Sequence, residues 1–187
     1  MSAHTPTLLF LYGPPAVGKL TVARAVAARR SFRVLHNHVT LDAVSEVLDF
    51  GSPAFWEAVS RLREDLVASA AREGLDLIFT YVYAPTDERH VARIADAFER
   101  HGGRVTFVQL VAPKDELLRR VSEESRRAHG KITDQETLLR VLEEHDVYQC
   151  VERASTLTLD VASLSAADAA DQILDHLDRG LDDREPR

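Results

Sequence analysis

One short segment near the start of the chain restricts the possible folds more than any other feature. The segment GPPAVGKLT occupies residues 13–21, after the apolar run LLFLY at 8–12 and before an alanine-rich helical stretch. The spacing Gly13-x4-Gly18-Lys19 is typical of a loop whose backbone N–H groups surround a phosphate while a lysine reaches its oxygens. Glycine is needed at both ends because the loop adopts positive φ angles and approaches the phosphate closely. A strand, this loop and a helix in that order predict a nucleotide-binding α/β fold.

The residue after the lysine departs from the commonest form of this loop. A serine or threonine there would offer a hydroxyl to Mg²⁺, but the chain has Leu20, and Thr21 follows one position later. Leucine cannot ligate magnesium, so we expect the metal to be held by phosphates, water and acidic side chains elsewhere. The residues expected to contact the nucleotide are Gly13, Pro14, Pro15, Ala16, Val17, Gly18, Lys19, Leu20 and Thr21.

The loop has a recognisable family pattern. The order Gly13-x-Pro15-x-x-Gly18-Lys19-x-Thr21 resembles the loop of adenylate kinases, in which the residue after the lysine also lacks a hydroxyl. A looser resemblance to small-molecule P-loop kinases, including shikimate and gluconate kinases, extends along most of the chain. This resemblance implies ATP and Mg²⁺ as cofactors and a small-molecule acceptor as partner.

Apolar runs alternate with helical patterns along the chain, which predicts an α/β fold with a mostly parallel sheet. The expected strands are 7–12, 32–36, 75–83, 105–111 and 156–160. The expected helices are 18–30, 40–48, 53–73, 87–101, 114–129, 134–148 and 166–179, the last capped by Ser165 and ended by Gly180. Right-handed crossovers then predict a three-layer α/β/α sandwich.

The family resemblance implies the strand order 2-3-1-4-5 in a P-loop nucleoside triphosphate hydrolase fold. We expect one domain over residues 1–187, with a helical lid at about 115–134 and a frayed tail at about 181–187.

Composition excludes several classes of partner. The chain of 187 residues is 45% apolar and 28% charged, as is ordinary for a globular protein. It contains no apolar stretch of the about 18 residues needed to span a membrane. We expect no signal peptide, because residues 1–13 lack a basic region and their apolar run is too short. The formal charge of −7 argues against a general affinity for nucleic acid. The only cysteine, Cys150, excludes an internal disulfide and suits a reducing compartment. We therefore expect a cytoplasmic monomer or homodimer.

Basic residues cluster at 115–131 of this acidic chain: Arg119, Arg120, Arg126, Arg127 and Lys131. A transferring phosphoryl group spreads negative charge over its oxygens, and guanidinium groups supply complementary donors. The spacing Arg120-x6-Arg127 resembles the lid of shikimate kinases, where the first arginine covers the base and the second meets phosphates. Arg119 and Arg126 are alternative candidates for either role, and Gly130 is a candidate hinge. The competing interpretation is a solvated helix with Glu/Arg pairs one turn apart.

The loop after the last predicted strand is a candidate for recognition of the base. In the family it resembles, the loop at Asp160 to Ser163 cradles adenine, largely through its backbone. The resemblance therefore implies nucleotide contacts at Asp160 and Ala162. An ordinary connection between a strand and a helix is the alternative.

Polar residues after the second predicted strand are candidates for the chemistry of the acceptor. The segment His36-Asn37-His38 stands where shikimate kinases place acids, one of which activates the acceptor hydroxyl, and Asp42 follows. Asp42 or His38 is thus a candidate general base, and Asn37 a candidate substrate contact. Asp42 could instead help to hold magnesium through water. Two histidines without a third ligand at fixed spacing do not indicate a zinc site. A purely structural role for the histidines is the alternative.

Further candidate substrate contacts come from the helix at 53–73 and from the strand after it. Shikimate kinases carry an arginine on the equivalent helix that grips the substrate carboxylate, and Arg63 matches it roughly. Phe55 and Trp56 could line an acceptor pocket or simply belong to the core. Tyr81 and Tyr83 could contact an acceptor or pack against helices.

Three functional hypotheses follow. The first is an ATP-dependent phosphotransferase that moves the γ-phosphoryl group of MgATP to a hydroxyl or phosphate of a metabolite, nucleotide or antibiotic, with Lys19 and the lid arginines stabilising charge. The second is a nucleotide hydrolase or switch, which usually needs an acid at the end of a strand. The strand at 75–83 ends without one, because Asp87 lies past Pro85. The third is a non-catalytic nucleotide-binding module, which would suit Leu20 but leave the lid arginines unexplained.

Overall fold

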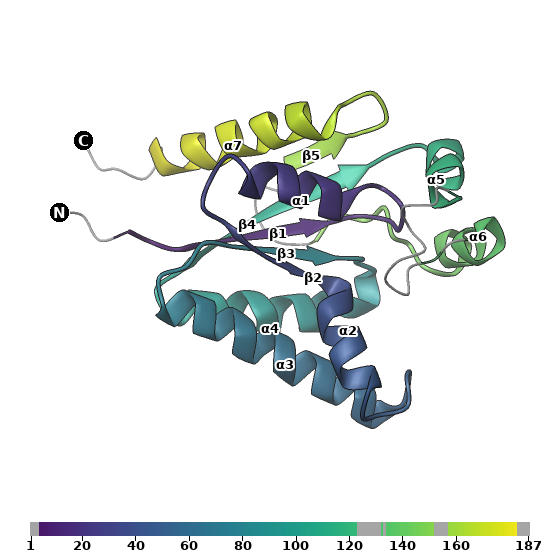
Figure 1. Cartoon of the computed structure of the whole chain (residues 1–187), viewed down its shortest axis with the longest axis horizontal. Coiled ribbons are helices and arrows are strands. Elements are labelled where there is room, and N and C mark those ends of the chain that lie inside the picture. Colours follow the sequence, from purple (N-terminus) through teal and green to yellow (C-terminus); the bar gives the residue numbers. More distant parts are fainter. Residues whose placement is uncertain (1–3, 123–131, 133, 152–156, 183–187) are drawn as a thin grey trace.

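A parallel sheet forms the centre of the molecule (Figure 1). The computed structural model describes residues 4–122, 132, 134–151 and 157–182. Within these residues the sheet has five strands in the order β2-β3-β1-β4-β5. The strands are β1 (Thr7–Tyr12), β2 (Arg33–His36), β3 (Leu77–Tyr81), β4 (Arg104–Val111) and β5 (Leu157–Asp160). The predicted α/β class and strand order are confirmed.

The central strand β1 separates two halves of the core. It pairs in parallel with β3 on one side and with β4 on the other. Because successive side chains of a strand point to opposite faces, Leu9 and Leu11 belong to one hydrophobic cluster, whereas Leu8 and Phe10 belong to the other. All four side chains are fully buried. This explains why the run at 8–12 is apolar without alternation.

Helices cover both faces of the sheet, as the sequence predicts. Helices α1 (Lys19–Ala27) and α7 (Ala166–Asp182) lie on one face, and α3 (Pro53–Arg72) and α4 (Glu88–Glu99) lie on the other (Figure 1). α3 begins where the Ser52 hydroxyl accepts a hydrogen bond from the Phe55 N–H at 3.2 Å. No helix in the described ranges combines the length and the apolar character needed to cross a membrane.

Three further helices lie near the ends of strands. α2 (Asn37–Ser45) follows β2 directly, while α5 (Lys114–Val121) and α6 (Gln135–Glu144) lie beyond the carboxyl ends of the strands (Figure 1). A short 3₁₀ turn, η1 (Pro85–Asp87), connects β3 to α4. Loops at this edge of a parallel sheet are where ligands bind in such folds.

Several predicted helix boundaries are wrong. The helix expected at 40–48 already begins at Asn37, whose N–H donates to the Thr80 hydroxyl on β3 at 3.2 Å. α6 ends at Glu144, because the backbone of His145 is extended. α7 continues through Gly180 to Asp182, since this glycine is not among those with positive φ. α5 is helical to Val121, and the rest of the helix expected to residue 129 lies largely outside the described residues.

Candidate active site

The loop at 13–21 has the conformation that its glycines predict. Gly13, Ala16 and Gly18 have φ angles of 146°, 68° and 100°, and α1 begins at Lys19, directly after the loop. A Cβ atom at Gly13 would lie 2.1 Å from the carbonyl oxygen of Leu110 on β4, whereas a Cβ at Gly18 would meet nothing within 4 Å. Gly13 is therefore required for both conformation and space, and Gly18 for conformation alone.

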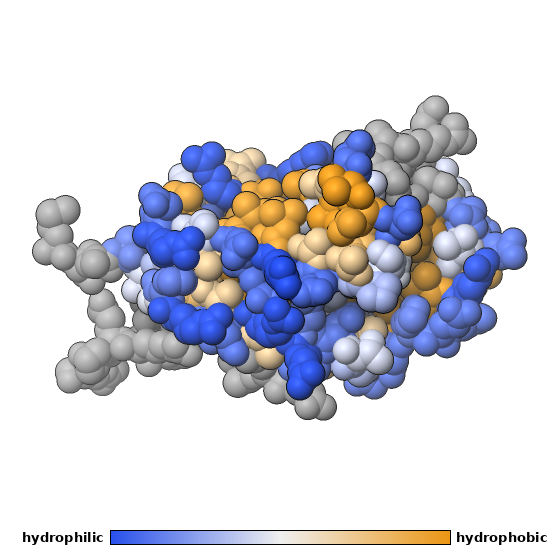
Figure 2. Space-filling view, turned by 90° about the horizontal axis from the view of Figure 1, so that it is seen from below, coloured by the Kyte–Doolittle hydropathy of each residue, from blue (hydrophilic) through white to orange (hydrophobic). Residues whose placement is uncertain are grey.

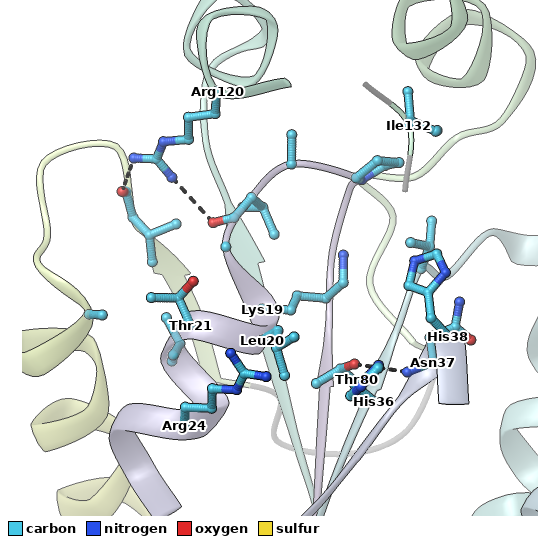
Figure 3. Close-up of a pocket in the computed structure, with 18 of the residues that line it drawn as sticks. Lys19, Leu20, Thr21, Arg24, His36, Asn37, His38, Thr80, Arg120 and Ile132 are labelled. Carbon is cyan, nitrogen blue, oxygen red and sulfur yellow. Dashed lines mark hydrogen bonds between the residues drawn. The ribbon is translucent and has the colours of Figure 1, made fainter. Parts of the chain in front are cut away.

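The lysine of the loop lies against the loop itself. Lys19 Nζ donates hydrogen bonds to the carbonyl oxygens of Gly13 and Pro14, each at 2.8 Å. Figure 3 shows its side chain rising beneath the loop, between Arg120 on one side and His38 on the other. A phosphate bound by the loop would accept hydrogen bonds from the same amine.

Arg120 joins two loops of the site. Its guanidinium donates to the carbonyl oxygen of Val17 in the phosphate loop at 3.2 Å and to that of Val161 after β5 at 2.8 Å (Figure 3). Its Nε donates to Glu116 at 2.6 Å. Hydrogen bonds from Arg119 and Arg120 lower the pKa of the Glu116 carboxyl to about 2, so the acid stays charged. Arg120 thus holds the phosphate loop and the loop after β5 together.

A cavity of about 870 Å³ surrounds the phosphate loop. One side is lined by the loop, by Leu164 just before α7, and by Ala166 and Ala169 at the beginning of α7. On the opposite side the lining residues come from the end of β2 and from α2, namely His36, Asn37, His38, Leu41, Asp42 and Ser45. The volume is within the range of cavities that bind small molecules and cofactors.

A second cavity of about 460 Å³ adjoins the first. The two share four lining residues, Asn37, Leu41, Val82 and Val141. The second cavity is also lined by Trp56, Ser60 and Arg63 of α3, by Tyr81 and Asp87 near the end of β3, by His90 of α4 and by His145 after α6. The site therefore offers two adjacent compartments, of which only the first contains the phosphate loop.

Arg63 is a buried cation in the second cavity. Its side chain is only 3% exposed, and it donates to the Thr40 hydroxyl at 2.9 Å and to Asn37 Oδ1 at 2.5 Å. The guanidinium lies 5.5 Å from the centre of the Tyr81 ring. Burial lowers the pKa of Arg63. Within the described residues no carboxylate forms an ion pair with it. A buried cation with neutral partners favours an anionic ligand.

The side chain of His90 on α4 lies beside the guanidinium of Arg63. Its Nε2 lies 3.4 Å from Arg63 Nη1, and its Nδ1 lies 3.3 Å from the Ser60 hydroxyl. Burial, followed by the charges of Arg63 and Arg93, lowers the pKa of His90 to about 4. His90 is therefore neutral at pH 7, and Nε2 accepts from the arginine because a guanidinium can only donate.

The acid Asp87 lines the same cavity, and its charge acts on Arg63. Burial raises the pKa of its carboxyl, which accepts a hydrogen bond from the Ala84 N–H at 3.1 Å. Burial is also the main reason that the pKa of Tyr81 is raised, with the charge of Asp87 as the second cause. A carboxyl and a phenol thus lie at the end of β3, beside the buried guanidinium.

The family model described as an AAA domain matches residues 8–147.

The chain belongs to this AAA domain family.

No curated protein matches the sequence significantly. Among solved structures, this AAA domain is similar to the shikimate kinase from Acinetobacter baumannii in complex with shikimate, with 19% identity, coverage of 98% of this chain and 97% of that chain, and a TM-score of 0.62. It is also similar to a gluconokinase from Sinorhizobium meliloti, with 14% identity, coverage of 98% and 99%, and a TM-score of 0.65. It is similar as well to the tunicamycin resistance protein of Deinococcus radiodurans, with 22% identity, coverage of 92% of this chain and 95% of that chain, and a TM-score of 0.64. These likenesses confirm the predicted P-loop kinase fold.

The AAA domain places its predicted site residues in three groups. His38, Asn37 and Asp42 line the cavity of the phosphate loop, and Trp56, Arg63 and Tyr81 line the second cavity. Asp160 accepts a hydrogen bond from the Ala162 N–H at 2.9 Å, and the Ala162 carbonyl lies 3.5 Å from Arg120 Nη2. Arg126, Arg127, Gly130 and Lys131 lie outside the described residues.

Two of the aromatic candidates lie in the core instead. Phe55 is fully buried and packs against Phe50 and Trp56, with ring centres 5.0 Å from each. Tyr83 is buried against Tyr12, and its hydroxyl donates to Glu88 at 2.9 Å. Neither residue lines either of the two cavities. Both residues therefore pack in the interior, which was the alternative to a role in binding the acceptor.

Sequence reasoning missed several residues of the site. Thr80 is buried at the end of β3, where its hydroxyl accepts from the Asn37 N–H, and a hydroxyl within an apolar strand could have indicated it. Ser60 and His90 carried no local signal, because they meet only where α3 packs on α4. The importance of Asp87 was missed because it follows Pro85 rather than the strand itself.

The residues around the phosphate loop fit Mg²⁺. Magnesium prefers oxygen ligands and usually keeps water and substrate phosphates among them. The hydroxyls of Thr21 and Thr80 and the carboxylate of Asp42 line the same cavity as the loop. No group of three His, Cys, Asp or Glu side chains is gathered around a metal position in the described part of the chain. A magnesium ion here would therefore take most of its ligands from phosphates and water.

Proposed function

We propose that this protein is an ATP-dependent phosphotransferase that moves the γ-phosphoryl group of MgATP to a small-molecule acceptor. The observation that carries the proposal is the second cavity, which adjoins the phosphate loop and has its own polar and aromatic lining. A nucleotide hydrolase or switch needs only water beside the nucleotide. A compartment for a second molecule favours transfer.

The donor nucleotide occupies the larger cavity in this proposal. Its phosphates bind the backbone of the loop and Lys19, and the positive end of α1 favours their charge. Its base lies near the start of α7, where the lining is apolar, and Arg120 holds the two loops that border it. Thr21 and Asp42 would help to hold Mg²⁺, which supplies positive charge at the phosphate oxygens. Arg126 and Arg127 remain proposed lid residues that neutralise the transferring group.

The acceptor occupies the smaller cavity. Arg63 binds an anionic group of the acceptor, because the guanidinium is buried and donates its hydrogen bonds to the neutral side chains of Thr40 and Asn37. Asn37 and Tyr81 border the same space. Asp42 or His38 receives the proton of an acceptor hydroxyl where the two cavities adjoin, because both line the cavity of the phosphate loop next to the shared residues Asn37 and Leu41.

The test is release of ADP from MgATP, with and without pooled metabolites and antibiotics. We expect release that depends on one pool in the wild type and falls by at least about 100-fold in Lys19→Ala, which should remain folded. Lys114→Ala is the matched control, because this lysine lies outside both cavity linings and forms an exposed ion pair with Glu143 at 3.3 Å. Release that is independent of every pool would instead assign the protein as a hydrolase, and equal rates in both variants would refute the role of the loop.

A further inference from the structure

The acceptor cavity has a polar floor and an apolar rim. Arg63 and His90 lie at its buried end, where hydrogen bonds fix both side chains. The apolar members of the lining, here called the rim, come from separate parts of the chain: Leu41, Trp56, Val82, Ala84, Val141 and Val147. The lining also includes polar side chains, namely Asn37, Ser60, Tyr81, Thr86, Asp87 and His145. A ligand that reaches Arg63 therefore contacts hydrocarbon as well as polar groups.

Trp56 is the largest side chain of this rim and packs against two other aromatic rings. Its ring lies 5.0 Å from Phe55 and 5.7 Å from Phe50, both in edge-to-face geometry with Trp56. Phe55 is fully buried, yet Trp56 itself is 46% exposed. Figure 2 looks at the molecule from the side of α3 and α4, and apolar residues gather on this face between polar margins. A tryptophan held by two aromatic neighbours offers a rigid apolar surface to the cavity.

We propose that the acceptor has a flat apolar body, an aromatic or other cyclic hydrocarbon group, that packs on Trp56 while its anionic group binds Arg63. This inference rests on the proposed function and specifies the class of substrate. A second copy of the chain could also cover an exposed tryptophan. The acceptor is favoured because Trp56 lines the same cavity as the buried cation, whereas a protein surface covers a rim without filling a cavity.

The sequence contains a single tryptophan, so intrinsic fluorescence reports on this rim directly. The probes are benzoate and gluconate, two carboxylates of equal charge with an apolar and a polyol body. We expect benzoate to change the fluorescence of Trp56 and to bind about 10-fold or more tightly than gluconate, because covering apolar surface gains affinity that a polyol does not. Calorimetry measures the affinities independently of the fluorophore.

The variants separate the rim from the floor. Trp56→Ala should weaken benzoate binding about 10-fold and leave gluconate binding unchanged, and Trp56→Phe should restore most of the loss. Leu66→Ala is the matched control, because Leu66 lies on the same helix with 41% exposure and lines neither cavity. Arg63→Lys should weaken both probes alike.

Equal affinities for the two probes, or benzoate binding that survives Trp56→Ala, would overturn the inference. A concentration-dependent dimer that dissociates in Trp56→Ala, together with no benzoate signal, would replace it with self-association. Binding of MgATP, measured in the same samples, distinguishes failure of the proposed phosphotransferase function from failure of the apolar-acceptor inference. A protein that binds MgATP and phosphorylates only polyols retains the phosphotransferase activity and refutes the apolar acceptor.

Discussion

Arg120 and Arg119 are adjacent arginines that share one acid but differ in what else they touch. Both donate to Glu116, and the side chain of Arg119 is 63% exposed. Of the hydrogen bonds among the described residues, those to the carbonyl oxygens of Val17 and Val161 come from Arg120, whose side chain is 19% exposed. We therefore predict that Arg120→Ala separates the phosphate loop from the loop after β5, whereas Arg119→Ala does not.

The size of the effect follows from these contacts. A hydrogen bond from a charged donor contributes roughly 1.5–3 kcal/mol, but both carbonyls border a cavity from which water can replace part of the loss. We expect Arg120→Ala to lower the free energy of unfolding by about 1–2 kcal/mol. The loosened loop should also lower the affinity for MgATP by roughly 10–100-fold, which corresponds to about 1.4–2.7 kcal/mol. For Arg119→Ala both changes should stay within about 0.5 kcal/mol.

Urea unfolding and calorimetric titration with MgATP measure the two quantities in the same preparations. Arg120→Lys serves as an intermediate, because an ammonium retains the charge but cannot span three acceptors as a planar guanidinium does. It should recover part of the stability and little of the affinity. If Arg120→Ala and Arg119→Ala bind MgATP equally well, the guanidinium does not hold the loops together and the reasoning fails.

The remaining predictions concern the loop and the floor of the second cavity. Gly13→Ala should destabilise the fold by roughly 3–5 kcal/mol, since positive φ and a Cβ 2.1 Å from the Leu110 oxygen both oppose it. Gly18→Ala should lower the free energy of unfolding by roughly 1–2 kcal/mol, because its Cβ would have space and only the positive φ opposes it. Equal thermal unfolding of the two variants would contradict this account. The pKa of His90 is about 4 in the folded protein and 6.5 in the unfolded chain, so the unfolded chain binds the proton more tightly. The contribution of neutral His90 to the free energy of unfolding is therefore complete above pH 6.5 and is lost as the pH falls toward 4. The loss amounts to about 3 kcal/mol, which urea unfolding at several pH values should show as a shallower acid dependence in His90→Gln than in the wild type. Parallel pH profiles would mean that His90 does not titrate in this way.

The local sequence predicts what depends on residues close together in the chain. The loop at 13–21 carries its own conformational requirements, because glycines at both ends permit the positive φ angles seen at Gly13 and Gly18. The alternation of apolar runs and helical patterns likewise determined the α/β class, since a parallel sheet needs a crossover between successive strands. The strand order required the family resemblance as well, because the pattern of elements alone allows several orders.

The tertiary structure decided how these parts form a site. Arg63 is bonded to Asn37 and Thr40, more than twenty positions away, because α3 packs beside α2. Ser60 and His90 meet only across the contact between α3 and α4. The role of Arg120 also depends on contacts with two distant loops, which no spacing in the sequence indicates. Helix packing sets such distances through the shapes of whole faces, so the cavities and the charges within them belong to the folded molecule rather than to any single motif.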